Sequence, residues 1–448
     1  MRNNLVLALA LIITSAIAIW GVWDTSGLLV FVSLLVNQLF HSRGWFIMLT
    51  VSTLVIVCLW LIFSPYGRIK LGQDDEEPEF STISWLTMLF AAGMGVGLLY
   101  WGSAEPISHY LIISKAYPAS ESALMALFVT NFHWGIHAWS IYAIMGLVIA
   151  YFTFRRNTHM LVSAPIHKVF GKHIWTQIVG SISDLSAIVA IAIGVGGSIA
   201  MGVFQVQGGI ENLFEIKSTG TTLALTIFSV LFIAYTLPLM VDLSRGMAII
   251  SNTNMLGATL LMLFVLLAGP THYLMGAIVE SFGKYAVEFL PHGFRTFSFF
   301  DWQTQNWFKS WTLTFMVWWL AWAPFVGVFI ARISRGRTIR EFILCVIFIP
   351  TLFSMFWFGV FGGIAFHEIL NKNVHLLDVV KTDVNSTVFA VLESLPMGGL
   401  TSSLTILIAF LFIVTSVVSA AYVLSMFSTG GNLVPSIKIK LVWGVILG

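Results

Sequence analysis

Charged residues are scarce in this sequence. Only 9% of its 448 residues are Asp, Glu, Lys or Arg, whereas 58% are hydrophobic. A soluble globular protein carries roughly 25% charged and 45–50% apolar residues, so this balance excludes a water-soluble domain. The formal net charge is +2, and no cluster of Lys or Arg marks a soluble face. We therefore expect no nucleic acid as a partner.

Cysteine is also nearly absent. The sequence contains Cys58 and Cys345, both inside apolar runs, so it predicts neither a disulfide framework nor a thiolate metal site. There is no P-loop and no GxSxG nucleophile motif, and His367-Glu368 lacks the second His of an HExxH zinc motif. The sequence therefore predicts neither an enzyme nor a resident cofactor.

Long apolar runs take the place of soluble domains. A membrane-spanning helix needs ~20 apolar residues to cross a hydrocarbon core of ~30 Å. The runs are continuously apolar instead of alternating, which favours helices over a β-barrel. We therefore predict an all-α polytopic membrane protein. The expected spans are residues 5–23, 45–63, 84–102, 122–152, 174–206, 221–240, 255–282, 310–330, 342–366 and 400–427.

The distribution of cationic residues predicts the orientation in the membrane. Fourteen of the 22 Lys and Arg residues lie near the N-terminus and in the connections 64–83, 153–173, 241–254, 331–341 and 428–440. Because cationic loops stay in the cytoplasm, we expect a multi-pass protein of the inner (plasma) membrane with a cytoplasmic N-terminus.

Two segments are expected to lie on the membrane surface instead of crossing it. The apolar run 27–36 is too short to span. Residues 284–309 mix phenylalanine and tryptophan with charged side chains, which is typical of an interfacial amphipathic helix.

The third predicted span contains a glycine-rich stretch. Gly93, Gly95 and Gly97 fall within five positions near its centre. Each glycine costs a helix about 1 kcal/mol relative to alanine, so the helix can unwind there. Unwinding would free carbonyls for a cation and amides for an anionic group. The alternative is a close packing face, because Gly93 and Gly97 form a GxxxG motif.

Six aromatic residues lie near the middle of two predicted spans. They are Trp134, Trp139 and Tyr142 in the fourth span and Trp318, Trp319 and Trp322 in the eighth. Tryptophan usually lies at the membrane interface, where its ring N–H stays hydrated. One interpretation is an ordinary aromatic core. The other is a cage for a quaternary ammonium group, which has no N–H to donate and binds aromatic faces with ~0.5–2 kcal/mol per contact.

Hydroxyl side chains occur in the tenth predicted span. A hydroxyl at Thr415 or Ser416 either bonds back to its own helix or supplies a hard oxygen ligand to a small cation such as Na⁺. Both interpretations stay open at this point.

Ionisable residues within the spans are further candidates. Acids inside a membrane are functional candidates by default, which applies to Glu105 and Asp184. Glu105 could instead cap the loop that follows the third span. His133 and His137 are four residues apart, but no third ligand is apparent, so we predict no metal site there.

Four of these segments resemble one transporter family. They are GMGVGLLYWGSAEP (93–106), NFHWGIHAWSIYAIMG (131–146), WWLAWAPFVGVFIARISRGRTIREF (318–342) and FIVTS (412–416). In these segments the sequence resembles the betaine/carnitine/choline transporter family. The resemblance implies a leucine-transporter-like inverted-repeat fold with two extra N-terminal spans, a homotrimer, and secondary uptake of quaternary ammonium compounds.

The resemblance also implies how the sequence is divided. Residues 1–83 would hold two spans and a cytoplasmic loop, 84–282 the first five-helix repeat, 283–309 the interfacial segment and 310–448 the second repeat. The family has twelve spans. We therefore expect the second repeat to be incomplete, because the sequence is C-terminally truncated by two spans relative to the family.

The ligand sites of the family carry over residue by residue. The resemblance places the quaternary ammonium at Trp134, Trp139, Tyr142, Trp318, Trp319 and Trp322, beside Gly93, Gly95 and Gly97. It places one sodium ion at the backbone carbonyls of Ala91, Met94 and Phe412 and at the hydroxyls of Thr415 and Ser416. Ile191 and Val195 match a second sodium site of the family but offer no side-chain oxygen, so one sodium site is expected.

We therefore expect a sodium-coupled symporter that takes up glycine betaine or a related osmolyte across the plasma membrane. The glycine at position 97 resembles the sodium-coupled betaine members, whereas proton-coupled choline members tend to carry Asp there. Two alternatives stay open. One is a choline or carnitine transporter with proton coupling or exchange, and the other is a transport-inactive truncated fragment.

Overall fold

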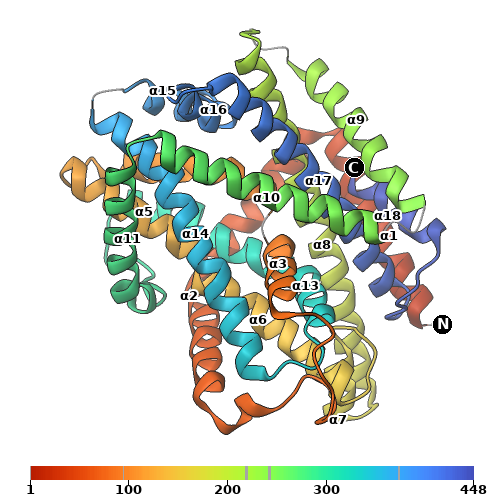
Figure 1. The fold of residues 1–448 in the computed structure, drawn as a ribbon. Helices are drawn as coiled ribbons and strands as arrows, with labels where there is room; N and C mark the ends of the chain where they lie inside the picture. Colours follow the sequence, from red (N-terminus) through yellow and green to blue (C-terminus); the bar gives the residue numbers. More distant parts are fainter. Residues whose placement is uncertain (1, 94, 217–219, 241–243, 372–373) are drawn as a thin grey trace.

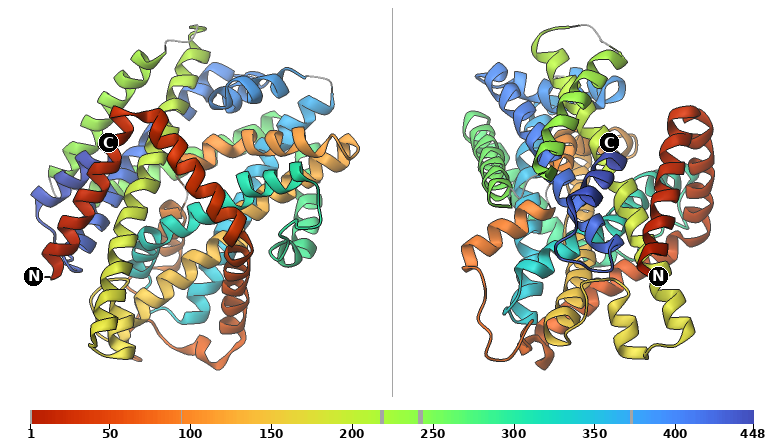
Figure 2. Two further views of the ribbon diagram at one scale, coloured as in Figure 1. Left: turned by 180° about the vertical axis from the view of Figure 1, so that it is seen from behind. Right: turned by 90° about the vertical axis from the view of Figure 1, so that its right-hand side faces the viewer.

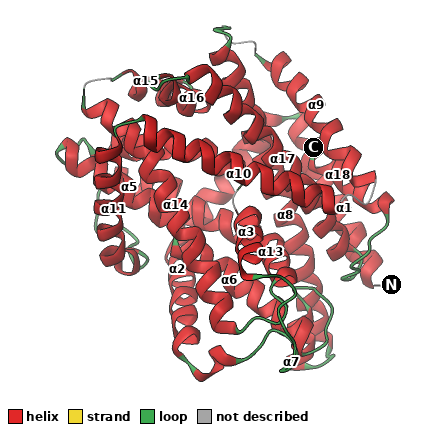
Figure 3. Cartoon of the chain, viewed as in Figure 1, coloured by secondary structure: helices red, strands yellow, loops and turns green. Residues whose placement is uncertain are grey.

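The computed structural model describes residues 2–93, 95–216, 220–240, 244–371 and 374–448, and most of these are helical (Figure 3). Within these ranges an isolated bridge between Lys70 and Thr338 is the only β-pairing. The described residues include nine segments that are long and apolar enough to cross a membrane. The prediction of an all-α polytopic membrane protein is confirmed.

The helices follow one another with mostly short connections (Figure 1). They are α1 (Arg2–Trp23), α2 (Thr25–Phe63), α3 (Thr82–Gly93), α4 (Val96–Ile113), α5 (Ala119–Trp134), α6 (Ile136–Ala150), α7 (Ala164–Phe170), α8 (Ile174–Leu213), α9 (Thr221–Met240), α10 (Ser244–Ala268), α11 (Thr271–His292), α12 (Trp302–Phe308), α13 (Thr314–Ile333), α14 (Ile339–Leu370), α15 (His375–Thr382), α16 (Thr387–Glu393), α17 (Gly398–Ser428) and α18 (Ile437–Leu447).

Helix α2 differs from the prediction. It runs without interruption over 39 residues, so 27–36 is the first part of a long helix and not a separate surface segment. Asp24 caps its start, because the carboxylate accepts a hydrogen bond of 2.9 Å from the N–H of Gly27. This first part lies at the edge of the bundle (Figure 2), where apolar side chains such as Leu29 and Leu34 are exposed. Such a surface suits contact with lipid.

The expected span over residues 255–282 is also wrong. Helix α10 ends at Ala268, and Gly269-Pro270 separates it from α11, which takes a different direction (Figure 1). A proline removes one backbone hydrogen bond of a helix and clashes with the preceding turn, which favours an interruption here. The boundary expected between residues 282 and 283 falls inside α11.

Two expected spans are split into helix pairs. In the third, α3 ends at Gly93 and α4 begins at Val96, with Gly95 in an extended conformation (φ −110°, ψ −165°). The glycine-rich stretch predicts this interruption. In the fourth, Gly135 separates α5 from α6. A side chain at Gly135 would lie 2.2 Å from the Tyr285 hydroxyl, so this break requires glycine.

Close helix contacts join segments that lie far apart in the sequence. Helix α6 packs along α13, and α8 packs along α17. The first contact uses small residues: a Cβ at Gly146 would lie 3.2 Å from the carbonyl of Gly327, and one at Gly327 would lie 3.1 Å from the N of Gly146. Small residues let membrane helices approach closely, because lipid gives no hydrophobic drive for association. This contact fixes α5 and α6 against α13.

The loop after α2 is tied to the loop between α13 and α14. The N–H of Leu71 donates to the carbonyl of Arg337 (2.8 Å), and the N–H of Gly336 donates to Leu71 (2.9 Å). Asp74 forms an ion pair of 2.7 Å with Arg155 at the end of the α6 segment. These contacts join three charged connections at one end of the molecule.

We expect this ion pair to make stability depend on pH. The hydrogen bond from Arg155 lowers the pKa of the Asp74 carboxyl below its ordinary value of 3.8. A carboxyl with a lowered folded-state pKa stabilises the fold above its unfolded pKa, and this contribution disappears as pH falls through the folded pKa. The Tm difference between wild type and Asp74→Asn should therefore be present near neutral pH and be smaller at an acid pH below the ordinary carboxyl pKa of 3.8. Asp75→Asn is the control, and an equal difference at both pH values would contradict the assignment.

Candidate functional site

A pocket lies beside the break between α3 and α4. It holds about 480 Å³ of empty space, which includes space open to the outside. Helices α4, α8, α13 and α17 surround it together with the end of α5. The residues used below are Gly95, Gly97, Trp134, Trp318, Trp319, Trp322 and Ser416, all of which line this pocket.

Three indoles form an aromatic wall of the pocket. The rings of Trp318 and Trp319 are stacked, with centroids 5.9 Å apart and an interplanar angle of 9°. Trp134 stands edge-on to Trp319 at 5.1 Å and 78°. Trp322 also lines the pocket from α13. The structure therefore brings together four of the six aromatic residues expected from the sequence, and they come from two separate spans.

The other two aromatic residues lie behind this wall. The Tyr142 ring is 5.7 Å from that of Trp319, and the Trp139 ring is 5.5 Å from that of Tyr142. Both residues are buried, and neither lines the pocket. They support Trp319 instead of facing the pocket directly.

The glycines bring the backbone close to the indoles. A Cβ built on Gly97 would lie 3.2 Å from Cη2 of Trp134 and 3.6 Å from Cη2 of Trp318. Gly95 lines the pocket where α4 begins, and Gly93 is the last residue of α3. Absence of side chains at positions 95 and 97 therefore keeps the pocket open toward the helix break.

We expect Gly97→Ala to weaken substrate binding. The added methyl group would push the indole of Trp134 by a few tenths of an ångström, which narrows the pocket. Overpacking of this kind costs about 1 kcal/mol or more, so the Km for uptake should rise about fivefold. Gly276→Ala is the matched control, because a Cβ there meets nothing within 4 Å. An unchanged Km for Gly97→Ala would argue against a ligand beside Trp134.

The expected sodium ligands are only partly described. Met94 lies outside the described residues, and Ala91 is described only as part of α3. On α17, the Thr415 hydroxyl donates to the carbonyls of Leu411 and Phe412, each at 3.1 Å. That is the back-bonding interpretation of a membrane hydroxyl. Ser416 lines the pocket, and its Oγ lies 3.9 Å from a Cβ built on Gly95.

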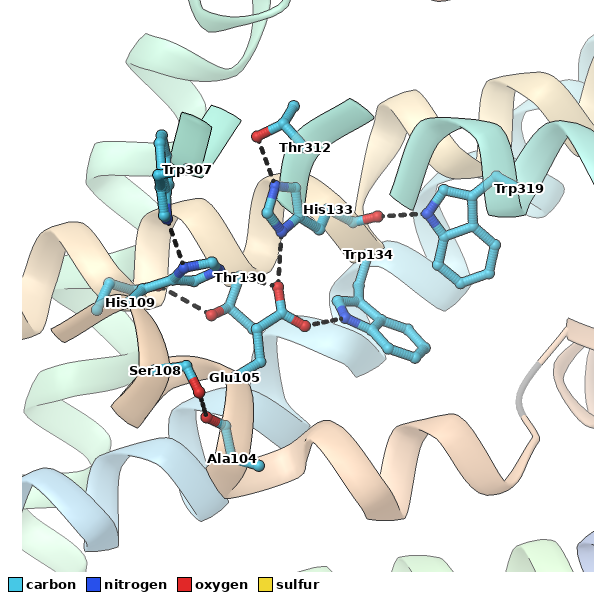
Figure 4. Close-up of polar contacts among 11 residues, drawn as sticks. Ala104, Glu105, Ser108, His109, Thr130, His133, Trp134, Trp307, Thr312 and Trp319 are labelled. Carbon is cyan, nitrogen blue, oxygen red and sulfur yellow. Dashed lines mark hydrogen bonds and ion pairs between the residues drawn. The ribbon is translucent and has the colours of Figure 1, made fainter. Parts of the chain in front are cut away.

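A buried polar network holds one of the indoles in place (Figure 4). The Nε1–H of Trp134 donates to Oε2 of Glu105 at 2.7 Å. Oε1 of Glu105 lies 2.7 Å from Nδ1 of His133 and 3.3 Å from Nε2 of His109. Glu105, His109 and His133 are fully buried. The carboxyl group of Glu105 therefore joins α4 to the end of α5 and fixes the ring that lines the pocket.

The outer partners of this network define the tautomer of one histidine. Trp307 can only donate, so its Nε1–H bond of 3.1 Å makes Nδ1 of His109 an acceptor. Neutral His109 then carries its proton on Nε2 and donates it to Glu105. The other side of His133 faces the Thr312 hydroxyl at 2.9 Å, which can either donate or accept. Glu105 thus has two donors, Trp134 and His109, and His133 is a third when Thr312 donates to its Nε2.

Sequence reasoning did not find this network. Glu105 was a candidate, but a role in capping the following loop stayed open, and His109 was not considered. The available signal was the spacing of Glu105 and His109, which are four residues apart and share one face of α4. Trp307 and Thr312 come from distant segments and could not be found from local patterns.

The histidine pair of α5 and α6 does not form a site. His133 bonds to Glu105, whereas the His137 ring lies 4.5 Å from the Phe132 ring and close to Gly293. Glu105, His109 and His133 do bring three ligand atoms within 4.8 Å of one another. The same atoms are joined by the hydrogen bonds of the network from Glu105 to His109 and His133.

An aromatic pocket at a broken helix, buried in a bundle of apolar spans, defines a membrane carrier of small molecules. The chain belongs to the betaine/carnitine/choline transporter family: residues 5–448 match the family described as "BCCT, betaine/carnitine/choline family transporter". It is therefore a transporter and not an enzyme. Its relatives are bacterial, which implies the plasma membrane.

Three relatives show the range of the family around this protein. The glycine betaine transporter OpuD of Bacillus subtilis (strain 168) is 40% identical over 97% of this chain and 84% of its own length. The ectoine/hydroxyectoine transporter of Virgibacillus pantothenticus is 35% identical over 92% and 82%. The osmo-independent choline transporter BetT1 of Acinetobacter baylyi is 35% identical over 92% and 78%.

Proposed function

We propose that this protein takes up glycine betaine or a related quaternary ammonium osmolyte in symport with Na⁺. The observation that carries the substrate class is the wall of Trp134, Trp318 and Trp319 beside the broken helix. A trimethylammonium group is a permanent cation without N–H groups. It binds most favourably to aromatic faces, and each such contact contributes ~0.5–2 kcal/mol.

The helix break in the third span offers a binding site for a second group of the ligand, its carboxylate. Gly95 begins α4, and the first N–H groups of a helix have no partner within it. A carboxylate on the substrate would meet these donors and the positive end of the helix dipole. The pocket thus offers aromatic faces for the ammonium group and amides for the carboxylate, which matches a zwitterionic betaine better than choline.

A hydroxyl group beside the helix break supports sodium coupling. Ser416 and the helix break lie on the same pocket, which places a hydroxyl oxygen close to freed backbone groups. The Thr415 hydroxyl would have to turn from its own helix to join them. We propose in addition a cytoplasmic N-terminus, which the distribution of Lys and Arg indicates, and a homotrimer, which the family resemblance implies.

Uptake measurements test the proposal directly. The protein would be expressed in a bacterial strain that lacks betaine uptake, and radiolabelled betaine and choline would be supplied at high osmolarity with and without Na⁺. We expect betaine uptake that requires Na⁺. Uptake indifferent to Na⁺ would favour proton coupling or exchange, and no uptake despite expression in the membrane would favour a transport-inactive protein.

We expect Ser416→Ala to weaken the response to sodium specifically. The hydroxyl is a hard oxygen ligand, and its loss should raise the Na⁺ concentration for half-maximal uptake several-fold at fixed betaine. Uptake at saturating Na⁺ should change less. Ser403→Ala on the exposed face of α17 is the control, because that hydroxyl bonds only to its own helix at Gly399. Identical sodium dependence in wild type and Ser416→Ala would refute this part of the proposal.

A further inference from the structure

A second pocket lies away from the substrate pocket, between the end of the α6 segment, α7 and the start of α8. It is a surface pocket with about 1,150 Å³ of empty space, which includes space open to the outside. Helix α7 lies at the same end of the molecule as the loop after α2 (Figure 1), to which Arg155 is bonded. The pocket therefore opens at the end that carries the charged connections.

The lining of this pocket carries basic side chains. Lys168, Lys172 and His159 contribute side chains, and none of the described residues that line it is acidic. Ser163 also lines it and is completely buried, yet its hydroxyl has no hydrogen-bond partner among the described residues. The carboxylate of Asp184 accepts a hydrogen bond of 2.9 Å from the backbone N–H of Ser163, and Asp184 does not line the pocket.

An exposed apolar surface adjoins the basic pocket. Phe170 ends α7 and Trp175 lies in the first turn of α8; their ring centroids are 5.5 Å apart. Their exposed fractions are 56% and 49%, and that of Ile174 is 74%. Aromatic side chains in such positions are typical of the membrane interface, where the rings meet acyl chains and the lysines meet head groups.

We propose that this pocket binds the phosphate head group of an anionic phospholipid. The two lysines neutralise the phosphodiester charge, and the Ser163 hydroxyl donates to one of its oxygens. Phe170, Ile174 and Trp175 contact the acyl chains. Free phosphate shares the head-group chemistry, but it would leave the adjoining apolar surface uncovered.

Thermal shift measurements on the purified full-length protein in detergent test the proposal. Short-chain phosphatidylglycerol, phosphatidylcholine and inorganic phosphate are titrated separately, and the concentration for half-maximal stabilisation is read from Tm. We expect phosphatidylglycerol to stabilise at far lower concentration than the other two. Each lysine contributes roughly fivefold, so Lys168→Gln/Lys172→Gln should raise this concentration about tenfold or more.

Two further variants keep the result specific. Lys438→Gln/Lys440→Gln removes the same charge elsewhere and should bind as wild type. Ser163→Ala leaves the charge unchanged, removes no capping hydrogen bond, and should still weaken binding. Equal binding of phosphatidylglycerol and phosphatidylcholine, or equal loss in both lysine variants, would overturn the proposal. Full competition by inorganic phosphate would likewise overturn the lipid assignment.

Discussion

Replacing Trp319 by alanine is expected to abolish high-affinity betaine uptake. The substitution removes one face of the stacked pair with Trp318 and the edge contact with Trp134. It also removes the support that Tyr142 gives to the pocket wall. Loss of one cation–π contact costs ~0.5–2 kcal/mol, and the collapse of the neighbouring rings adds to it, so Km should rise roughly tenfold or more.

The conservative variant separates the two roles of this indole. Trp319→Phe keeps an aromatic face but loses the hydrogen bond of 2.8 Å from Nε1–H to the carbonyl of His133. We expect its Km to lie between those of wild type and Trp319→Ala. Trp60→Leu, at an exposed position of α2, is the control for loss of a membrane tryptophan. Unchanged Km and Vmax in Trp319→Ala would contradict the assignment of these aromatic residues to an ammonium cage.

Replacing Glu105 by leucine should damage both stability and transport. The change leaves the N–H groups of Trp134 and His109 buried without an acceptor and removes the partner of His133. Each unsatisfied buried group costs about 1–3 kcal/mol, so the loss of stability should reach about 3 kcal/mol or more. Released from Glu105, the Trp134 ring no longer holds its position in the pocket, and uptake should be lost.

Glutamine at position 105 distinguishes positioning from charge. Its carbonyl oxygen can still accept from Trp134, and its amide can donate to Nδ1 of His133 if Thr312 accepts the proton on the other side. The amide cannot accept from Nε2–H of His109, so one hydrogen bond of the network is lost. We expect Glu105→Gln to keep most of the Tm and to raise Km by less than Glu105→Leu does. Glu121→Gln at the exposed start of α5 is the control. A Glu105→Leu protein with wild-type Tm and Km would show that the network does not position Trp134.

Composition and motif spacing predicted the class of protein, and the family resemblance predicted most of the pocket residues. The apolar runs predict spans because the bilayer sets their length, and the glycine-rich stretch predicts the interruption before α4. Four of the six mid-span aromatic residues line the pocket. These predictions rest on local sequence patterns, because the hydrocarbon core restricts the length and the composition of each span.

Features that depend on contacts between distant segments could not be predicted from local sequence patterns. Gly135 is a single glycine in an apolar run, and its break follows from the close approach of Tyr285, which lies 150 positions further along the sequence. Polar and charged residues within 38–43 concealed the continuity of α2. The pairing of Glu105 with His133 requires α4 and α5 to lie side by side, which no single segment indicates.

The break at Gly135 has a consequence for the order in which the carrier works. In an uninterrupted helix the carbonyl of His133 would bond to the N–H of His137; here Trp319 of α13 donates to it instead. We propose that this ring contacts the transported cation, and its hydrogen bond ties it to the last turn of α5, beside the bend between α5 and α6. We therefore expect a change of that bend during transport to alter the orientation of Trp319, so that helix bending and release of the cation are coupled.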